Sequence, residues 1–170
     1  MTATPTDLPT SPAALLSRLE KLGIEAVTHD HPPLMTVDDS KALRGDLPGA
    51  HCKNLFLKDK KGRLFLVVAQ EDRAIDLKAL RKAIGAAQLS FGKPELLGEV
   101  LGITPGAVTP FSLINDTDHR VTVILDKAMI EDFDLVNYHP LTNEKTTALS
   151  PADLIRFIEA CGHKPQILPL

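Results

Sequence analysis

Two short apolar runs separated by a polar turn form the clearest pattern in the sequence. Residues 54–58 and 63–69 are rich in β-type residues, and Asp59-Lys60-Lys61-Gly62 lies between them. Apolar runs of this length, joined by residues that favour turns, are typical of paired strands. The pattern therefore predicts a β-hairpin over residues 54–69.

Capping residues precede several apolar stripes with helical spacing. Ser11-Pro12 stands before leucines at 15, 16, 19 and 22, and Gly23 follows them. A Ser side chain can accept the free N–H groups of a first helical turn, Pro fits that turn, and Gly tolerates the left-handed backbone that ends a helix. By the same signals, further helices are predicted at residues 36–45, 76–85, 94–102 and 150–162.

Short segments of β-type residues lie between the predicted helices. Besides the hairpin, the predicted strands are residues 24–28, 88–91, 111–114, 121–125, 136–138 and 146–149. Helices and strands therefore alternate irregularly, which favours an α+β fold with a mixed sheet over a regular βαβ series. Because the chain shows no repeat or linker, we expect one domain over residues 1–170, with residues 1–10 loosely held.

The composition is that of a globular chain. Its 170 residues are 44% hydrophobic and 24% charged, which is enough to bury a core. The apolar runs are too short to cross a bilayer, and the N-terminus has neither the basic nor the apolar region of a signal peptide. Cys52 and Cys161 are far apart and form no CxxC pair, as expected in a reducing compartment. We therefore expect a cytoplasmic protein with no membrane partner.

Positive charge is concentrated in one part of the chain. The net charge is −3, but residues 41–93 hold 12 basic and 5 acidic side chains. A local positive surface suits a polyanion such as a nucleic acid, because phosphate attraction extends over about 8 Å at physiological salt. The candidate contacts are Lys58, Lys60 and Lys61, around the hairpin turn. An ordinary solvated face is the alternative interpretation.

Several common catalytic motifs are absent from the sequence, namely a P-loop, Gly-x-Gly-x-x-Gly, Gly-x-Ser-x-Gly and His-Glu-x-x-His. His29 and His31 could be two metal ligands, but histidines before a double proline are more often turn residues. We expect no metal and no cofactor. Cys52 beside Lys53 could be an activated thiolate, although a small packing residue is the more common role.

A lysine and an asparagine open the first strand of the hairpin. Lys53 and Asn54 precede the apolar residues 55–57, so a rigid strand can hold both polar side chains at a cleft. A lysine that simply points to water is the alternative.

Four segments, in this order, resemble the YbaK/prolyl-tRNA-synthetase-associated editing-domain family. They are His31-Pro32-Pro33 with Thr36-Val37, Lys53-Asn54-Leu55-Phe56-Leu57, the segment 102–111, and Asn137-Tyr138-His139-Pro140-Leu141 with Asn143. Over residues 12–165 the sequence is most similar to the free-standing deacylases of the family that remove alanine from proline tRNA, the ProXp-ala or PrdX type. Two residues depart from the family pattern: Cys52 stands where relatives commonly carry Thr, and Ser112 where Gly is common.

The resemblance implies a mixed sheet curled into a partly barrel-like core with helices outside. It also implies that water hydrolyses the ester between an amino acid and the 3′ end of tRNA(Pro), with Lys53, Asn54 and His139 as catalytic residues. The implied substrate pocket is formed by His31, Thr36, Gly102, Pro105, Gly106, Val108, Pro110 and Phe111. The implied partners are the acceptor end of tRNA(Pro) carrying a wrong amino acid and prolyl-tRNA synthetase.

A hydrolytic second site of this kind has a physical reason. A synthetase pocket built for proline excludes the smaller alanine by only about 1–3 kcal/mol, so a second sieve is needed. Three alternatives stay open at this point: a deacylase for cysteinyl-, seryl- or threonyl-tRNA, a nucleic-acid-binding protein without catalysis, and a metal-dependent hydrolase that uses the histidines.

Overall fold

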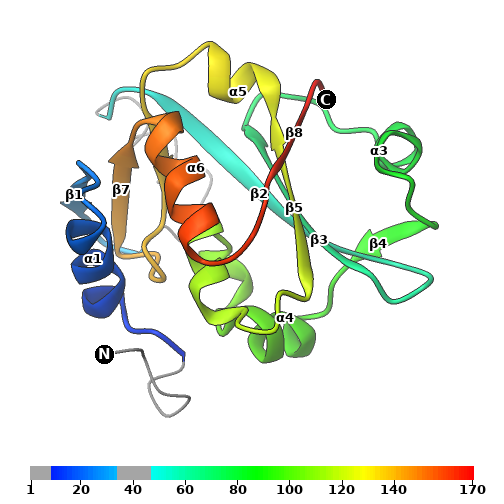
Figure 1. The fold of residues 1–170 in the computed structure, drawn as a ribbon, viewed down its shortest axis with the longest axis horizontal. Coiled ribbons are helices and arrows are strands. Elements are labelled where there is room, and N and C mark those ends of the chain that lie inside the picture. The colour runs from blue at the N-terminus through cyan, green and yellow to red at the C-terminus, as the bar shows by residue number, and fades with distance from the viewer. Residues whose placement is uncertain (1–8, 34–46) are drawn as a thin grey trace.

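The computed structural model describes residues 9–33 and 47–170 as a mixed sheet with helices packed on it (Figure 1). The α-helices are α1 (Pro12–Lys21), α3 (Leu77–Ile84), α4 (Pro94–Leu101), α5 (Lys127–Glu131) and α6 (Pro151–Ala160), and two 3-10 helices are η2 (Pro105–Ala107) and η3 (Pro110–Asn115). The strands are β1 (Val27–Asp30), β2 (Ala50–Asp59), β3 (Leu64–Gln70), β4 (Leu89–Phe91), β5 (Val121–Asp126), β6 (Val136–Tyr138), β7 (Lys145–Leu149) and β8 (Gln166–Leu168). Within these ranges, no helix has the length and apolar character needed to cross a membrane.

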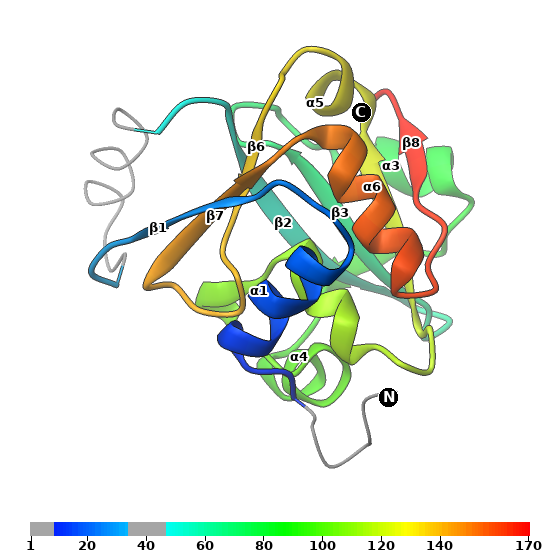
Figure 2. The ribbon, with the colours of Figure 1, turned by 60° about the vertical axis from the view of Figure 1, so that its left-hand side comes forward.

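The eight strands form a mixed sheet around β2. Their order is β1-β7-β6-β2-β3-β5-β8, and β4 also pairs with β2. β2 runs antiparallel to β3 and β4 but parallel to β6, and β5 is parallel to both of its neighbours, β3 and β8. β1 and β7 run steeply across the direction of β2 and β3 (Figure 2), so the sheet is strongly curled. The predicted α+β fold with a curled mixed sheet is confirmed.

Alternate residues of the central strands enter two separate hydrophobic cores. On β3, residues 64, 66 and 68 enter the main core, whereas Phe65 and Val67 enter a second core on the other face. This follows from the two-residue period of a strand. Helices α1, α4 and α6 cover the main core, and α3 covers the second core with Leu80. Both faces of β3 are therefore buried.

Side-chain caps begin three of the predicted helices where the sequence indicated. Each capping oxygen accepts a backbone N–H of the first turn: Ser11 from Ala14 at 3.1 Å, Asp76 from Lys78 at 2.9 Å and Ser150 from Asp153 at 3.1 Å. Gly85 and Gly102 end α3 and α4 with φ of +67° and +65°. The predicted hairpin is also confirmed, and its first strand begins earlier than predicted, at Ala50.

The predicted strand at 111–114 is wrong, because this segment forms η3. The Thr109 hydroxyl accepts from the N–H of Phe111 at 3.3 Å, and Pro110 fits the first turn. These local interactions outweigh the β propensity of the apolar residues. The strand predicted at 24–28 is shifted to Val27–Asp30, and the short elements α5 and β8 were not predicted. The helix predicted at 36–45 lies outside the described residues.

Asp116 joins two distant segments next to the last strand. Its carboxylate accepts from the backbone N–H groups of Arg120 at 3.0 Å and Val121 at 2.9 Å, and from Nε2 of His163 at 2.9 Å. The ring of His119 packs edge-on against that of His163, with centroids 5.0 Å apart. Burial by itself would raise the pKa of Asp116, but these hydrogen bonds outweigh it and lower the pKa below 3.8. The carboxylate therefore ties the start of β5 to the segment before β8.

Asp116→Asn should lower the free energy of unfolding by about 1–3 kcal/mol, because buried donors lose their charged acceptor. Folding lowers the pKa of Asp116, so its carboxylate contributes fully to stability at a pH above the ordinary pKa of an aspartate. This contribution is lost as the pH falls below that ordinary pKa. Urea unfolding between about pH 5 and pH 3 should therefore show a steeper loss of stability for the wild type than for the variant. The exposed Asp118→Asn is the control, and equal pH slopes for wild type and Asp116→Asn would contradict this role.

Candidate active site

The central strand β2 changes partners along one of its edges. Ala50 and His51 pair with β6, and residues 57–59 pair with β4, while β3 occupies the opposite edge over residues 52–58. In the part of the chain that the structure describes, residues 53–55 have no ladder partner on the edge shared by β6 and β4. The sheet therefore forks beside Lys53 and Asn54.

The side chains of Lys53 and Asn54 leave opposite faces of β2, as neighbours on a strand do. Asn54 lies on the face of Phe56, which belongs to the main core, and among the described residues its buried Oδ1 has no hydrogen-bond partner. Lys53 lies on the face of Leu57, which belongs to the second core, and its Nζ donates to the carbonyl of Arg73. The cation and the amide thus reach the fork from opposite sides of the sheet.

Arg73, which no sequence signal indicated, connects Lys53 to a buried carboxylate. Its Nε lies 3.4 Å from Oδ2 of Asp126, whose side chain is fully buried. Oδ1 of the same carboxylate accepts from the backbone N–H of Leu170 at 3.2 Å. The loop after β3 is therefore anchored to β5 and to the C-terminal residue, and its carbonyl holds the Lys53 ammonium in place.

The two predicted site histidines come together. The ring centroids of His31 and His139 are 6.1 Å apart. His31 follows β1, with Nε2 2.8 Å from the hydroxyl of Thr146 and Nδ1 2.8 Å from the carbonyl of Pro32. His139 follows β6, and its Nδ1 donates to the carbonyl of Lys145 at 2.9 Å. β7 pairs with both β1 and β6, so it determines the separation of the two rings.

Burial has the largest effect on the charge of His139. It lowers the pKa of the imidazole below 6.5, the carbonyl of Lys145 opposes this, and His31 lowers the pKa further. The ring is therefore uncharged at neutral pH, with its proton on the nitrogen that faces the carbonyl. Nε2 carries a lone pair that can accept a hydrogen bond from water or from a hydroxyl group.

The histidine pair lies on the Lys53 face of the sheet. The register places Asn137 of β6 opposite His51, and Ala148 of β7 opposite Asn137. Thr146, which contacts His31, is two residues from Ala148 and so shares its face. On the opposite face of β6 and β7, Val136, Tyr138 and Leu149 belong to the main core. Lys53 and the histidines are therefore on one side of the sheet, away from the main core.

Only part of the predicted pocket segment, residues 102–111, is at the surface. Pro105 and Gly106 of η2 are exposed, and Val108 is half-buried against the main core. A Cβ added to Gly106 would lie 4.0 Å from Nδ2 of Asn143, in the loop that begins at His139. The structure thus places η2 beside the loop between β6 and β7.

The remaining predicted pocket residues have supporting positions. Pro110 and Phe111 are buried, and the Phe111 ring packs edge-on against Tyr138 and Phe157 at centroid distances of 6.0 and 5.4 Å. A Cβ added to Gly102 would come within 2.7 Å of Pro9. These three residues shape the segment without forming its exposed surface. Thr36 lies outside the described residues.

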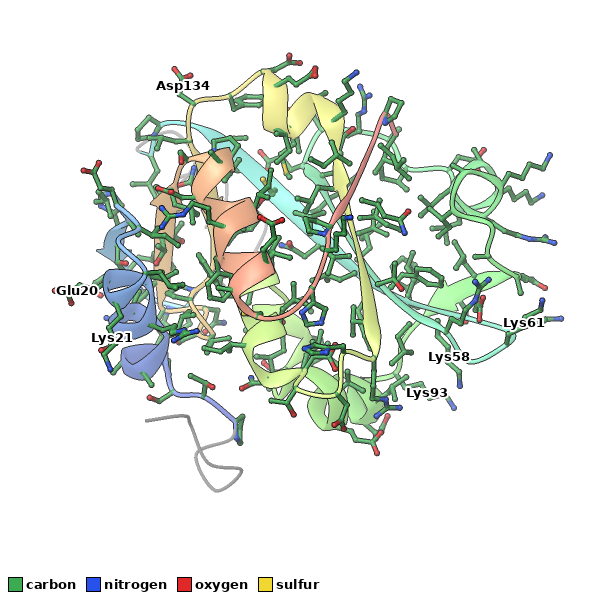
Figure 3. All side chains as sticks on the ribbon, in the orientation of Figure 1. Glu20, Lys21, Lys58, Lys61, Lys93 and Asp134 are labelled. Atoms are coloured by element: carbon green, nitrogen blue, oxygen red, sulfur yellow. The ribbon has the colours of Figure 1, made fainter. Side chains whose placement is uncertain are left out.

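The predicted nucleic-acid contacts lie at the far end of β2. Lys58, Lys60 and Lys61 are exposed around the hairpin turn. Figure 3 shows Lys58 and Lys61 at one end of the molecule, with Lys93 close by, opposite α1, β1 and β7. Along β2, Lys58 is about 17 Å from Lys53 at about 3.3 Å per residue. The structure therefore separates these cations from the Lys53 and histidine region.

Cys52 is a packing residue. Its Sγ lies 3.5 Å from Sδ of Met129, and burial, opposed by a hydrogen bond from Tyr138, raises the pKa of the thiol to about 12. The side chain also leaves the face of β2 opposite to Lys53. The hypothesis of a thiolate activated by Lys53 is therefore wrong. Within residues 9–33 and 47–170, no group of three or more His, Cys, Asp or Glu side chains is arranged to hold a metal ion.

Comparison with known proteins finds similarity to aminoacyl-tRNA editing domains and to proteins related to prolyl-tRNA synthetase. The family model for the aminoacyl-tRNA editing domain matches residues 31–157. A prolyl-tRNA synthetase associated domain-containing protein 1 from Danio rerio is 40% identical over 151 residues, covering 88% of this chain and 82% of the relative. The prolyl-tRNA editing protein ProX from Acetoanaerobium sticklandii is 37% identical, covering 88% of this chain and 92% of the relative.

A more distant relative and a solved structure of similar fold extend the comparison. The multifunctional Ser/Thr-tRNA deacylase ProXp-y from Escherichia coli is 27% identical, covering 86% of this chain and 85% of the relative. A solved structure of a candidate trans-editing enzyme for prolyl tRNA synthetase superposes with a TM-score of 0.71 at 20% identity. The match covers 99% of this chain and 98% of that structure. This structural likeness independently supports the fold described above.

Cys52 and Cys161 should both resist alkylation in the folded protein. Burial raises the pKa of each thiol to about 12, and the thiolate is the reactive form. At pH 8, iodoacetamide should modify them at least about tenfold more slowly than in urea, as followed by mass spectrometry of the intact protein. Rapid modification of Cys52 in the folded protein would show that its thiol is accessible and ionised.

Proposed function

The chain belongs to the aminoacyl-tRNA editing domain family, and on that premise we propose that it removes alanine from mischarged tRNA(Pro) by hydrolysing the aminoacyl ester. The similarity to a prolyl-tRNA editing protein supports proline tRNA as the substrate. The name of the Danio rerio relative supports prolyl-tRNA synthetase as the partner enzyme that produces the mischarged tRNA. Such a substrate would place the protein in the cytoplasm.

The observation that carries the proposal is the position of Lys53 at the fork of the sheet. Lys53 lies on β2, which pairs with β3, and its ammonium group donates a hydrogen bond to the carbonyl of Arg73. A fixed cation can stabilise the negative charge that develops on an ester carbonyl oxygen, or hold the terminal phosphate. The buried Oδ1 of Asn54, which has no partner among the described residues, adds a polar atom that can orient the substrate at the same fork.

Water is the nucleophile in this proposal. An aminoacyl ester is reactive enough for a well-positioned water to attack it, and the thiol of Cys52 is protonated at neutral pH. Nε2 of the uncharged His139 can accept the proton of the attacking water and return it to the leaving ribose oxygen. The products are the free amino acid and an intact tRNA 3′ end.

We assign the pocket for the amino acid to η2 and the loop that begins at His139. Gly106 faces Asn143 across this space, and a glycine lets the backbone approach a small aminoacyl group closely. Pro105 and Val108 complete the rim, His31 joins it through its ring contact with His139, and Gly102, Pro110 and Phe111 support the segment from inside. This assignment predicts that side-chain volume at Gly106 sets the upper size of the amino acid.

A second candidate substrate follows from the Escherichia coli relative, whose name gives seryl- and threonyl-tRNA as its substrates. Serine differs from alanine by one hydroxyl group. A hydrophobic pocket rejects an added hydroxyl only about 100-fold, so a site for alanine can also accept serine. Deacylation of seryl-, threonyl- or cysteinyl-tRNA is therefore the alternative to compare directly.

Lys58, Lys60 and Lys61 are proposed to hold the acceptor stem of the tRNA. They are exposed, and none of them forms an ion pair with a described residue. Lysines placed like this attract phosphates in any sequence and make binding depend on salt. They would contribute to affinity for tRNA and not to the chemical step.

Lys53→Ala should lower the rate of alanyl-tRNA(Pro) hydrolysis by about 100-fold, the loss seen when one transition-state donor is removed. Release of labelled alanine under single-turnover conditions measures this rate, and circular dichroism checks the fold. Lys21→Ala, at an exposed lysine of α1 that is not among the proposed tRNA contacts, is the control and should keep the wild-type single-turnover rate. A folded Lys53→Ala protein with full activity would disprove the mechanism.

The enzyme should hydrolyse alanyl-tRNA(Pro) at least about 100-fold faster than prolyl-tRNA(Pro), because the bulkier proline ring meets a close-packed wall. Alanyl, seryl, threonyl, cysteinyl and prolyl esters on the same tRNA should be compared under one set of conditions, with and without a chelator. Equal hydrolysis of the prolyl ester would rule out an editing role. Preference for the seryl, threonyl or cysteinyl ester would select the alternative substrate, and sensitivity to the chelator would select metal-dependent hydrolysis.

A further inference from the structure

Phe91, at the end of β4, is the most exposed large apolar side chain among the described residues, at 63%. We propose that its ring is a stacking platform for an unpaired base of the tRNA 3′ end. This inference rests on the proposed function, because it names a second contact of the same substrate. Aromatic rings beside cations are the usual means of holding unpaired nucleotides, since every base has a face that can stack.

The strand register places Phe91 on the face of the sheet that carries Lys53. Phe91 is paired directly with Leu57, and paired residues point to the same face. Leu57 alternates with Leu55 and Lys53 on β2, so the ring and the Lys53 ammonium leave the same face. Along the strand, their separation is about 13 Å. At about 3.4 Å per stacked nucleotide, this distance spans about four nucleotides.

The backbone around Phe91 is held rigidly. The N–H of Gly92 donates to the carbonyl of Phe56 at 2.9 Å. A Cβ at position 92 would come within 2.4 Å of the Phe56 ring, so only glycine fits this close approach. Phe91 is therefore presented on a fixed backbone, and stacking on it would cost little conformational freedom.

Cations lie near the end of β4. Lys58 is paired with Ser90, the neighbour of Phe91, and so leaves the opposite face of the sheet, while Lys93 follows Phe91 by two residues. Figure 3 shows Lys58, Lys61 and Lys93 gathered at this end of the molecule. The last turn of α3, which packs near β4, adds Arg81 and Lys82. An exposed ring in this positive field suits a polyanion with aromatic bases better than an apolar protein surface.

Phe91→Ala and Phe91→Trp, with Val27→Ala as the matched control, test the proposal. Val27 is 59% exposed but lies on β1, at the other side of the molecule. Binding of uncharged tRNA(Pro) is measured by filter retention, with intact tRNA and with tRNA from which the unpaired 3′ nucleotides have been removed. Phe91→Ala should weaken binding of intact tRNA about tenfold, within the range for loss of one stacked base. Binding of the shortened tRNA should not change, and Phe91→Trp and Val27→Ala should bind intact tRNA like the wild type.

Hydrolysis separates this proposal from the proposed function. With alanyl-tRNA(Pro), Phe91→Ala should raise KM about tenfold with kcat nearly unchanged, whereas hydrolysis of the alanyl ester of adenosine alone should be unaffected. A wild-type protein that hydrolyses neither substrate would disprove the proposed function while the binding assay still reports on the ring. Unchanged binding by Phe91→Ala, or an equal loss with intact and shortened tRNA, would overturn the stacking role.

Discussion

The arrangement of this protein depends on one constraint, the pairing of β2 with three other strands. A strand has two edges, and β3 occupies one of them over residues 52–58. β6 and β4 must therefore share the other edge, one at each end. Because the partner changes midway, residues 53–55 lie where the sheet opens, within a strand that is otherwise held by hydrogen bonds. Polar side chains at this point gain access to ligands without the mobility of a loop.

The pleat of β2 determines how the chemistry is distributed around that opening. Lys53 and Asn54 leave opposite faces because they are neighbours, and no rotamer can bring both to one side. The Lys53 face also carries the two histidines, through the registers of β6 and β7. Asn54 instead faces the main core with an unpartnered oxygen, at least among the described residues, which is costly unless a ligand or water satisfies it. A ligand that contacts both residues must enter the fork itself and not lie on one face of the sheet.

Local signals in the sequence predicted the elements that local interactions determine. The caps at Ser11, Asp76 and Ser150 and the hairpin turn were identified because a few adjacent residues suffice for each. The same local chemistry explains the error at 111–114, where the hydroxyl of Thr109 and the ring of Pro110 favour a 3-10 turn over a strand. The short strand β8 was missed because its three residues gain their stability from β5, far away in the sequence.

In the site, too, the sequence indicated individual residues, whereas the contacts between them depend on segments far apart in the chain. The family resemblance indicated His31 and His139, but their contact depends on β7, which lies between β1 and β6 and supplies Thr146 to one ring and the Lys145 carbonyl to the other. The anchoring of Lys53 by the carbonyl of Arg73 depends on the packing of the loop after β3. No spacing in the sequence contains this information, because it arises from the order of strands in the sheet.

Distance along β2 also limits what each cation can do. At physiological salt, the field of an exposed charge falls off over about 8 Å, whereas Lys58 lies about 17 Å from Lys53 along the strand. The hairpin lysines therefore cannot stabilise charge that develops on an ester at Lys53. What they can do is raise the local concentration of a polyanion and orient it before the reacting group arrives. In the proposed function, the contacts that capture the tRNA and the group that takes part in the chemistry therefore lie about 17 Å apart on one strand, and a change at one of them need not disturb the other.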